Sequence, residues 1–269
     1  MFRKFEVTIS PPEVEENLPF LVENGLGVEL MLYDIDYTRN AKAASLQRIG
    51  NLLRKNGITP TAHGPFYDLN PGSRDSSVRS YTLRCFSETL EACSHLGVSL
   101  VVFHTGLNPL LPITYQKIWL DISMDSWKPV VREAEEKKIV IAIENTFARD
   151  SSTIEAIVRE VSSEWLKVCF DAAHVHVYSR KPIEEWLDNL DGLVRKIHLN
   201  DNAGEHDDHL SLGEGNMDIV NVFRQLEKRK LFPIVTLELD VSRFEKSLDF
   251  LEEHKLWKRK KRELIPRTK

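Results

Sequence analysis

Cysteine is scarce in this sequence, which excludes a fold held together by disulfide bonds. The 269 residues contain three cysteines, Cys85, Cys93 and Cys169, which is too few and of the wrong parity for a disulfide framework. Their spacing is not that of a zinc knuckle either. We therefore interpret them as buried thiols of a protein in a reducing cytoplasm.

Long hydrophobic runs are also absent. The apolar run at 98–103 is far too short to span a bilayer, and the first six residues mix charged and apolar side chains without the apolar stretch of a signal peptide. The net charge is -5 and the pI is near 6.0, so the whole chain has no electrostatic attraction to nucleic acid or anionic membranes, although a local basic patch could still matter. We expect a cytoplasmic protein without a membrane partner.

Linkers rich in proline, glycine or serine are missing, and the chain instead alternates between two kinds of segment. Short β-branched runs predict strands at about 2–9, 27–32, 58–63, 98–104, 139–144, 166–171, 194–199 and 234–239. Apolar residues three and four positions apart predict helices at about 12–24, 40–56, 75–96, 114–138, 151–163, 182–190, 216–230 and 242–257. Eight strand–helix units in a chain of this length predict an α/β fold, a single-domain TIM (β/α)8 barrel.

A doubly wound open sheet could use the same alternation, but the polar residues favour a closed barrel. They end the predicted strands three to eight in succession, whereas in an open sheet only the strands beside the switch point share a site. We assign the barrel to residues 1–257 and a basic tail to residues 258–269. The tail could meet phosphates, but a charge run at a terminus is usually a solvated segment.

Four of these residues form the core of a predicted metal site at the rim of the barrel. Glu144, Asp171, His198 and Glu238 each stand at the end of a predicted strand, after Val140-Ile141-Ala142-Ile143, Leu166-Lys167-Val168-Cys169-Phe170, Arg195-Lys196-Ile197 and Val235-Thr236-Leu237 respectively. A carboxylate aimed at a barrel axis is costly unless a cation neutralises it, although any one of them alone could cap a helix or pair with a lysine. Together they predict a divalent-metal site suited to Mn, Mg, Co or Zn.

A second group of candidate ligands stands at or near the same strand ends: His63, His104, His174, Asp207 and His209. Nine ligands exceed the usual coordination number of one transition ion. Either two or three ions bind, or some of these side chains contact substrate. His95 and His254 lie on predicted helices, and we interpret them as structural.

The motifs around these residues occur in a recognisable order. They are His63-Gly64-Pro65-Phe66, Phe103-His104-Thr105-Gly106, Ile143-Glu144-Asn145-Thr146, Phe170-Asp171-Ala172-Ala173-His174, His198-Leu199-Asn200-Asp201, Asp207-Asp208-His209 with Gly213-Glu214-Gly215, and Leu237-Glu238-Leu239. As a set they resemble the xylose isomerase-like barrel superfamily, which holds sugar isomerases and epimerases together with the endonuclease IV type of abasic-site nuclease. The resemblance covers nearly the whole chain.

The resemblance implies roles for all nine residues. Glu144, Asp171, His198 and Glu238 match the metal positions that the family shares. The other five match positions that the nuclease branch uses for a three-zinc cluster. That branch has a His-x-x-Tyr-Leu-Ile-Asn-like run where residues 63–70 of this chain differ, and its Asp-Thr-Cys-His is replaced at residues 171–174.

These departures favour a metal-dependent isomerase or epimerase of a sugar or sugar phosphate. One ion would stabilise an enediolate, Glu144 and Glu238 would remove and return the proton, and His174 would hydrogen-bond a substrate oxygen. The partner would be a small carbohydrate. The alternative is an abasic-site endonuclease or metallo-phosphodiesterase with up to three zinc ions, so nucleic acid is a less favoured partner. A lyase, a dehydratase and a non-catalytic sugar-binding barrel also fit.

One further acidic residue, Glu29, lies on the predicted second strand. It resembles a glutamate that many isomerase-like relatives carry there, but an ion pair facing a helix explains it equally well. We leave it out of the predicted site. The substrate, the metal and the oligomeric state are not determined by the sequence.

Overall fold

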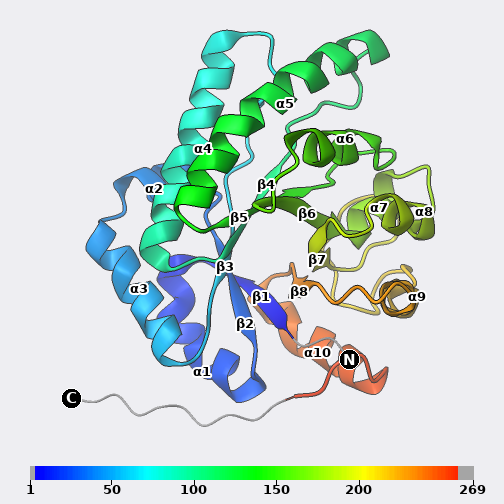
Figure 1. The fold of residues 1–269 in the computed structure, drawn as a ribbon. Helices are drawn as coiled ribbons and strands as arrows, with labels where there is room; N and C mark the ends of the chain where they lie inside the picture. Colours follow the sequence, from blue (N-terminus) through cyan, green and yellow to red (C-terminus); the bar gives the residue numbers. More distant parts are fainter. Residues whose placement is uncertain (1–3, 260–269) are drawn as a thin grey trace.

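The fold is a closed barrel of eight parallel strands, β1 to β8 in chain order, with β8 hydrogen-bonded to β1 (Figure 1). The computed structural model describes residues 4–259. The strands are β1 Phe5–Ile9, β2 Gly27–Met31, β3 Thr61–His63, β4 Leu100–His104, β5 Val140–Glu144, β6 Leu166–Asp171, β7 Val194–Leu199 and β8 Ile234–Leu237. The predicted single-domain α/β barrel is therefore confirmed.

Helices cover the outside of the barrel (Figure 1). Their buried apolar side chains pack against those of the strands and form the hydrophobic core with them. They are α1 Val14–Asn24, α2 Ile35–Asn40, α3 Ala43–Lys55, α4 Ser76–Leu96, α5 Ile113–Glu136, α6 Ser152–Val161, α7 Ala172–Tyr178, α8 Ile183–Asn189, α9 Ile219–Lys228 and α10 Phe244–Glu253. In α9, Ile219, Val222, Phe223 and Leu226 are buried at the spacing of one helix face. The Asp218 side chain accepts a hydrogen bond from the backbone N–H of Asn221 and begins this helix.

Two short helices were not predicted, and both lie next to strand ends. Helix α2 precedes α3, so the helix predicted from residue 40 begins at Ala43. Helix α7 starts directly after β6, and the Asp171 carboxylate caps it by accepting a hydrogen bond from the backbone N–H of His174 at 2.6 Å. Helix α7 thus ties Asp171 to His174 at the rim.

The last described residues lie on the side of the barrel where the strands begin. Trp257 packs against Phe5 with ring centroids 6.0 Å apart. Arg259, in the predicted tail, forms ion pairs with Glu245 and Asp249 of the last helix region. Residues 260–269, which carry the rest of the predicted basic tail, lie outside the described residues, and the boundary at 257 stays a prediction.

Two sequence-based expectations concern the rest of the chain. All three cysteines are free and buried, as predicted. Within residues 4–259, no helix combines the length and the apolar character that crossing a lipid bilayer requires.

Candidate metal centre

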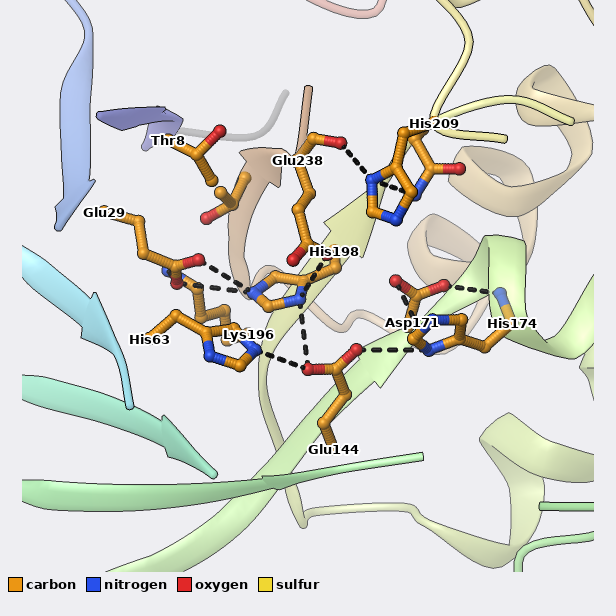
Figure 2. A network of polar contacts seen from close by, with 12 residues as sticks. Thr8, Glu29, His63, Glu144, Asp171, His174, Lys196, His198, His209 and Glu238 are labelled. Atoms are coloured by element: carbon orange, nitrogen blue, oxygen red, sulfur yellow. Dashed lines mark hydrogen bonds and ion pairs between the residues drawn. The ribbon is translucent and has the colours of Figure 1, made fainter. Parts of the chain in front are cut away.

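The nine predicted ligands converge at the rim formed by the carboxyl ends of the strands. Figure 2 shows His63, Glu144, Asp171, His174, His198, His209 and Glu238, and His104 and Asp207 contact this group through Glu144 and His174. The barrel brings them together because parallel strands end on the same side. Strand ends supply His63, His104, Glu144, Asp171, His198 and Glu238; helix α7 supplies His174; and the loop after β7 supplies Asp207 and His209.

Glu144 lies at the centre of this group. Its Oε2 is 3.2 Å from His63 Nε2 and 3.3 Å from His198 Nδ1, and its Oε1 is 3.1 Å from His174 Nδ1. The side chain is fully buried. Burial alone would raise the pKa of this carboxyl, but the neighbouring His198 and hydrogen bonds from His104 and His174 hold its pKa well below the usual range.

The first ligand set consists of His63, His104 and Glu144. The two Nε2 atoms are 3.2 Å apart, and Glu144 Oε2 is 3.2 Å and 3.5 Å from them. Ligand atoms about 2.0–2.1 Å from a tetrahedral zinc ion lie roughly 3.3 Å from each other, so this triangle has the size of a metal site. The Nδ1–H of His63 donates to the carbonyl of Gly64 at 2.8 Å, which leaves the Nε2 lone pair facing the set.

The second set consists of Glu144, Asp171, His198 and Glu238, which can each offer one atom within 4.8 Å of the others. His198 Nδ1 is 3.0 Å from Glu238 Oε2. Asp171 Oδ2 and Glu238 Oε2 are buried and accept no hydrogen bond. Burial and the carboxylates of Glu144 and Glu238 raise the pKa of Asp171 to about 7. A bound cation would satisfy these oxygens and relieve the repulsion.

The third set consists of His174, Asp207 and His209. Asp207 Oδ2 is 3.0 Å from His174 Nε2 and 3.1 Å from His209 Nε2. The Nδ1–H groups of the two histidines donate to the backbone carbonyls of Asn145 at 3.0 Å and Glu238 at 2.7 Å. Both rings are therefore held with Nε2 toward Asp207, the orientation that metal-binding histidines show.

The loop that carries Asp207 and His209 is organised by a buried aspartate. The carboxylate of Asp201 accepts hydrogen bonds from the backbone N–H groups of Gly213 at 2.9 Å and Gly215 at 3.0 Å. A Cβ at Gly215 would lie 2.2 Å from the carbonyl oxygen of Asn202, so only glycine fits there. His209 itself has a φ of +46°, a strained value for a side chain of this kind.

Sequence reasoning missed two residues that contact the ligands, Glu29 and Tyr33, and one that contacts Glu29, Lys196. Glu29 is fully buried inside the barrel, 3.2 Å from His198 Nε2 and 2.6 Å from Lys196 Nζ, so its interpretation as an ion pair facing a helix was wrong. Tyr33 donates a hydrogen bond to Glu238 Oε1 at 3.2 Å. The signal for Lys196 was its place two residues before His198, because alternate strand residues share a face.

Two cavities open beside the ligand sets. The first has a volume of about 690 Å³ and includes His104 in its wall. Most of its wall is apolar or aromatic, with Phe66, Phe147 and Tyr178 around the basic side chain of Arg149. The second has a volume of about 590 Å³ and is bordered by Tyr33, His209, Glu238, Thr8, Ser10 and Glu13 among others. The ligand sets are thus reached from an apolar side and from a polar, hydroxyl-rich side.

Comparison with known proteins places the chain in a family. A family model described as xylose isomerase-like TIM barrel matches residues 23–260. The chain belongs to this family. The superfamily expected from the motifs is therefore confirmed.

Proteins similar to this chain in amino-acid sequence include some with a named activity and some without. The protein MJ1311 of Methanocaldococcus jannaschii is 30% identical over 184 residues, which cover 65% of this chain and 62% of that protein, just under two thirds of its length. A probable endonuclease 4 of Akkermansia muciniphila is 28% identical over 249 residues, covering 81% of this chain and 88% of that protein.

Solved structures share the fold over almost the whole chain. A D-tagatose 3-epimerase-like protein has a TM-score of 0.82 at 24% identity, with 94% of this chain and 97% of that chain covered. The TTHB071 protein of Thermus thermophilus, in a structure soaked with ZnCl2, has a TM-score of 0.79 at 28% identity, with 94% and 98% covered. The first of these likenesses shows the fold alone.

Proposed function

We propose that this protein is a metal-dependent hydrolase of a small phosphate ester or phosphodiester, with ions held by all three ligand sets. The observation that carries the proposal is the convergence of nine side chains. The first two ligand sets share Glu144, and beside them Asp207 Oδ2 lies 3.0 Å from His174 Nε2 and 3.1 Å from His209 Nε2. An isomerase needs the second set alone. The proposal therefore reverses the order favoured by the sequence, in which the isomerase came first.

Bound divalent ions would supply Lewis acidity for the phosphate and make water a stronger nucleophile at neutral pH. The chain's own groups would then orient the substrate. Arg149 lies in the wall of the first cavity, which also contains His104, and its guanidinium suits a phosphate oxygen pair. Tyr33 holds Glu238 through its hydroxyl. The aromatic wall would limit the access of bulk water.

Charge on the rim supports a small substrate over duplex DNA. The segments between strand ends and the following helices contain few basic residues: there is no lysine or arginine at 32–34, 105–112 or 200–216, and Arg74, Arg149 and Arg243 are single arginines after β3, β5 and β8. Proteins that bind DNA through its backbone neutralise several phosphates with such side chains. The relatives named as probable endonuclease 4 support phosphodiester chemistry, and the rim supports a smaller ester as its target.

A sugar isomerase or epimerase is the second candidate, and the hydroxyl-rich cavity beside Glu238 favours it. The hydroxyl and carboxylate groups in the wall of this cavity would hydrogen-bond the hydroxyls of a sugar. In this candidate the second set holds one ion, Glu144 and Glu238 move the substrate proton, and His174 hydrogen-bonds a substrate oxygen. The structural likeness to epimerases supports the fold that such an enzyme uses.

Metal content and two activity assays separate the candidates. For the hydrolase we expect about three zinc ions per chain by elemental analysis and hydrolysis of bis(p-nitrophenyl) phosphate. His63→Ala and His209→Ala should each lose zinc from the set to which the residue belongs, and both variants should lose the hydrolysis. His95→Ala, on the outer face of α4 beside Gln47 and Glu91, serves as the matched control and should match the wild type. One ion per chain, retained in His63→Ala, with deuterium exchange into a ketose or sugar phosphate, would favour the isomerase and overturn the hydrolase.

A further inference from the structure

A chain of alternating charges lies inside the barrel next to the second ligand set (Figure 2). Lys196 Nζ is 2.7 Å from Glu6 Oε2 and 2.6 Å from Glu29 Oε2, and the Glu29 carboxylate is 3.2 Å from His198 Nε2. All four side chains are fully buried. Neither metal coordination nor the barrel core requires this arrangement, because apolar side chains could fill the same space.

We propose that Glu29 and Lys196 are a positioning pair that fixes the imidazole of His198 so that Nδ1 faces the metal. The inference rests on the metal centre of the proposed function but not on its substrate. Neither residue would touch the metal or the substrate. They act through His198, and Figure 2 shows Glu29 on the side of the ring away from Glu144 and Glu238.

The geometry of the ring supports this role. His198 Nδ1 lies 3.3 Å from Glu144 Oε2 and 3.0 Å from Glu238 Oε2, so Nδ1 belongs to the ligand set. The opposite nitrogen, Nε2, lies 3.2 Å and 3.3 Å from the two oxygens of the Glu29 carboxylate. The thiol of Cys169 also lies beside the ring. When Nε2–H donates to Glu29, the lone pair remains on Nδ1. A carboxylate in this position also makes the imidazole a more basic ligand.

Lys196 explains how Glu29 can stay ionised without contact with water. Burial opposes the charge of Glu29, and the ammonium group of Lys196, 2.6 Å from Glu29 Oε2, compensates for it. The ammonium group has three hydrogens, and it has three acceptors: Glu6, Glu29 and the hydroxyl of Thr61 at 2.7 Å. Its orientation is therefore fixed, and through it that of Glu29.

Glu6 offers a matched control for Glu29. Both are fully buried glutamates that contact Lys196. Glu6 also contacts Lys4 at 2.7 Å and Thr61, but none of its contacts among residues 4–259 is with His198. A glutamate-to-glutamine change at either position removes one buried charge beside Lys196. Only the change at Glu29 alters the partner of the metal-binding ring.

The test measures zinc affinity of the full chain by competition with a chromophoric chelator, with thermal unfolding of each metal-free variant as the check on folding. We expect Glu29→Gln to weaken one binding step by about 10–100-fold, the usual effect of such outer partners. Glu6→Gln should stay within about 3-fold of the wild type. In the His198→Ala background, Glu29→Gln should cause no further loss, because its effect passes through that ring.

Three results would overturn the pairing: an unchanged affinity in Glu29→Gln, an equal loss in Glu6→Gln, or a further loss when Glu29→Gln is added to His198→Ala. If Glu29→Gln does not fold, Glu29→Asp and Glu6→Asp replace the single variants and carry the same comparison, because each withdraws one carboxylate from Lys196 and leaves the lysine in place. A wild type that binds no zinc would contradict the metal centre itself. Zinc binding with no effect of Glu29→Gln would contradict only the positioning pair.

Discussion

Glu144→Gln is the substitution that tests the shared ligand most directly. Glu144 Oε2 belongs to the first set with His63 and His104 and to the second set with His198. The third set does not use it as a ligand. We therefore expect the variant to keep its fold, to retain about one of three ions, and to lose turnover.

The size of the effect follows from linkage between binding and stability. An ion present at about 1,000 times its dissociation constant stabilises the native state by about 4.1 kcal/mol. For a chain of this size, 1 kcal/mol corresponds to roughly 2 °C in melting temperature. Each ion should then raise the melting temperature by roughly 8 °C, and loss of two ions should remove roughly 16 °C of the metal-dependent increase.

The assay compares each variant with its own metal-free form. This comparison matters because loss of a buried charge paired with imidazoles can itself cost up to about 3–5 kcal/mol. Glu91→Gln is the matched control, since Glu91 pairs with Lys137 on the surface of α4, remote from the ligand sets. Three ions retained in Glu144→Gln, with the full metal-dependent increase in melting temperature, would refute the shared-ligand assignment.

Three further predictions follow from charges in and around the centre. In the metal-free protein, the pKa of Asp171 is raised from 3.8 to about 7 and that of His209 from 6.5 to about 9. The stability that each proton contributes is complete below the unfolded-state pKa and is lost as pH rises through the folded-state pKa. In EDTA the melting temperature should therefore fall from pH 6 to pH 9. With zinc bound, that fall should disappear, and its persistence would argue against metal binding by these residues. Arg149→Gln should raise KM for a phosphate ester several-fold with little change in kcat. The control Arg180→Gln, at a surface arginine after α7, should change neither constant. If the Arg149 variant had the kinetics of the wild type, Arg149 would not contact the phosphate. Abasic duplex should bind weakly and without incision, with a log K that changes by less than about 2 per log salt because few phosphates are contacted; tight binding with a steep slope would restore the DNA nuclease.

The position of the ligands could be predicted from the sequence because all strands of a parallel barrel end on the same side, so the last residues of successive strands meet at one rim. Glu144 and Asp171 follow mostly apolar runs, His198 follows Ile197, and all three stand at or next to the place where their strands were expected to end. Periodicity alone identifies that place to within a few residues. The bounds were therefore less accurate than the positions of the ligands, as β3 shows: it was predicted from residue 58 and begins at Thr61.

The interior charges could not be predicted in the same way. A strand residue faces either the barrel axis or the surrounding helices, and for one isolated charge the sequence gives no preference. Glu29 is on the axis side because its partner Lys196, 167 positions later in the chain, is on that side too. Helix α7 was missed because it begins directly after β6 with no loop between them, and Asp171 both ends the strand and caps the helix. Only closure of the barrel and the tertiary contacts determine these features.

The electrostatics of the metal-free centre argue that its natural state contains cations. Several carboxylates lie within one connected group, and the burial that surrounds them should lower the pKa of each neighbouring imidazole. Burial does lower the pKa of His104. The pKa values of His63, His174, His198 and His209 are instead raised, because the carboxylates around them favour protonated rings. The protons supply positive charge at the nitrogens that face the ligand sets. Metal binding would release the protons from these histidine nitrogens and place a cation beside the same atoms. The negative charge of the carboxylates would then be neutralised without a change in the fold.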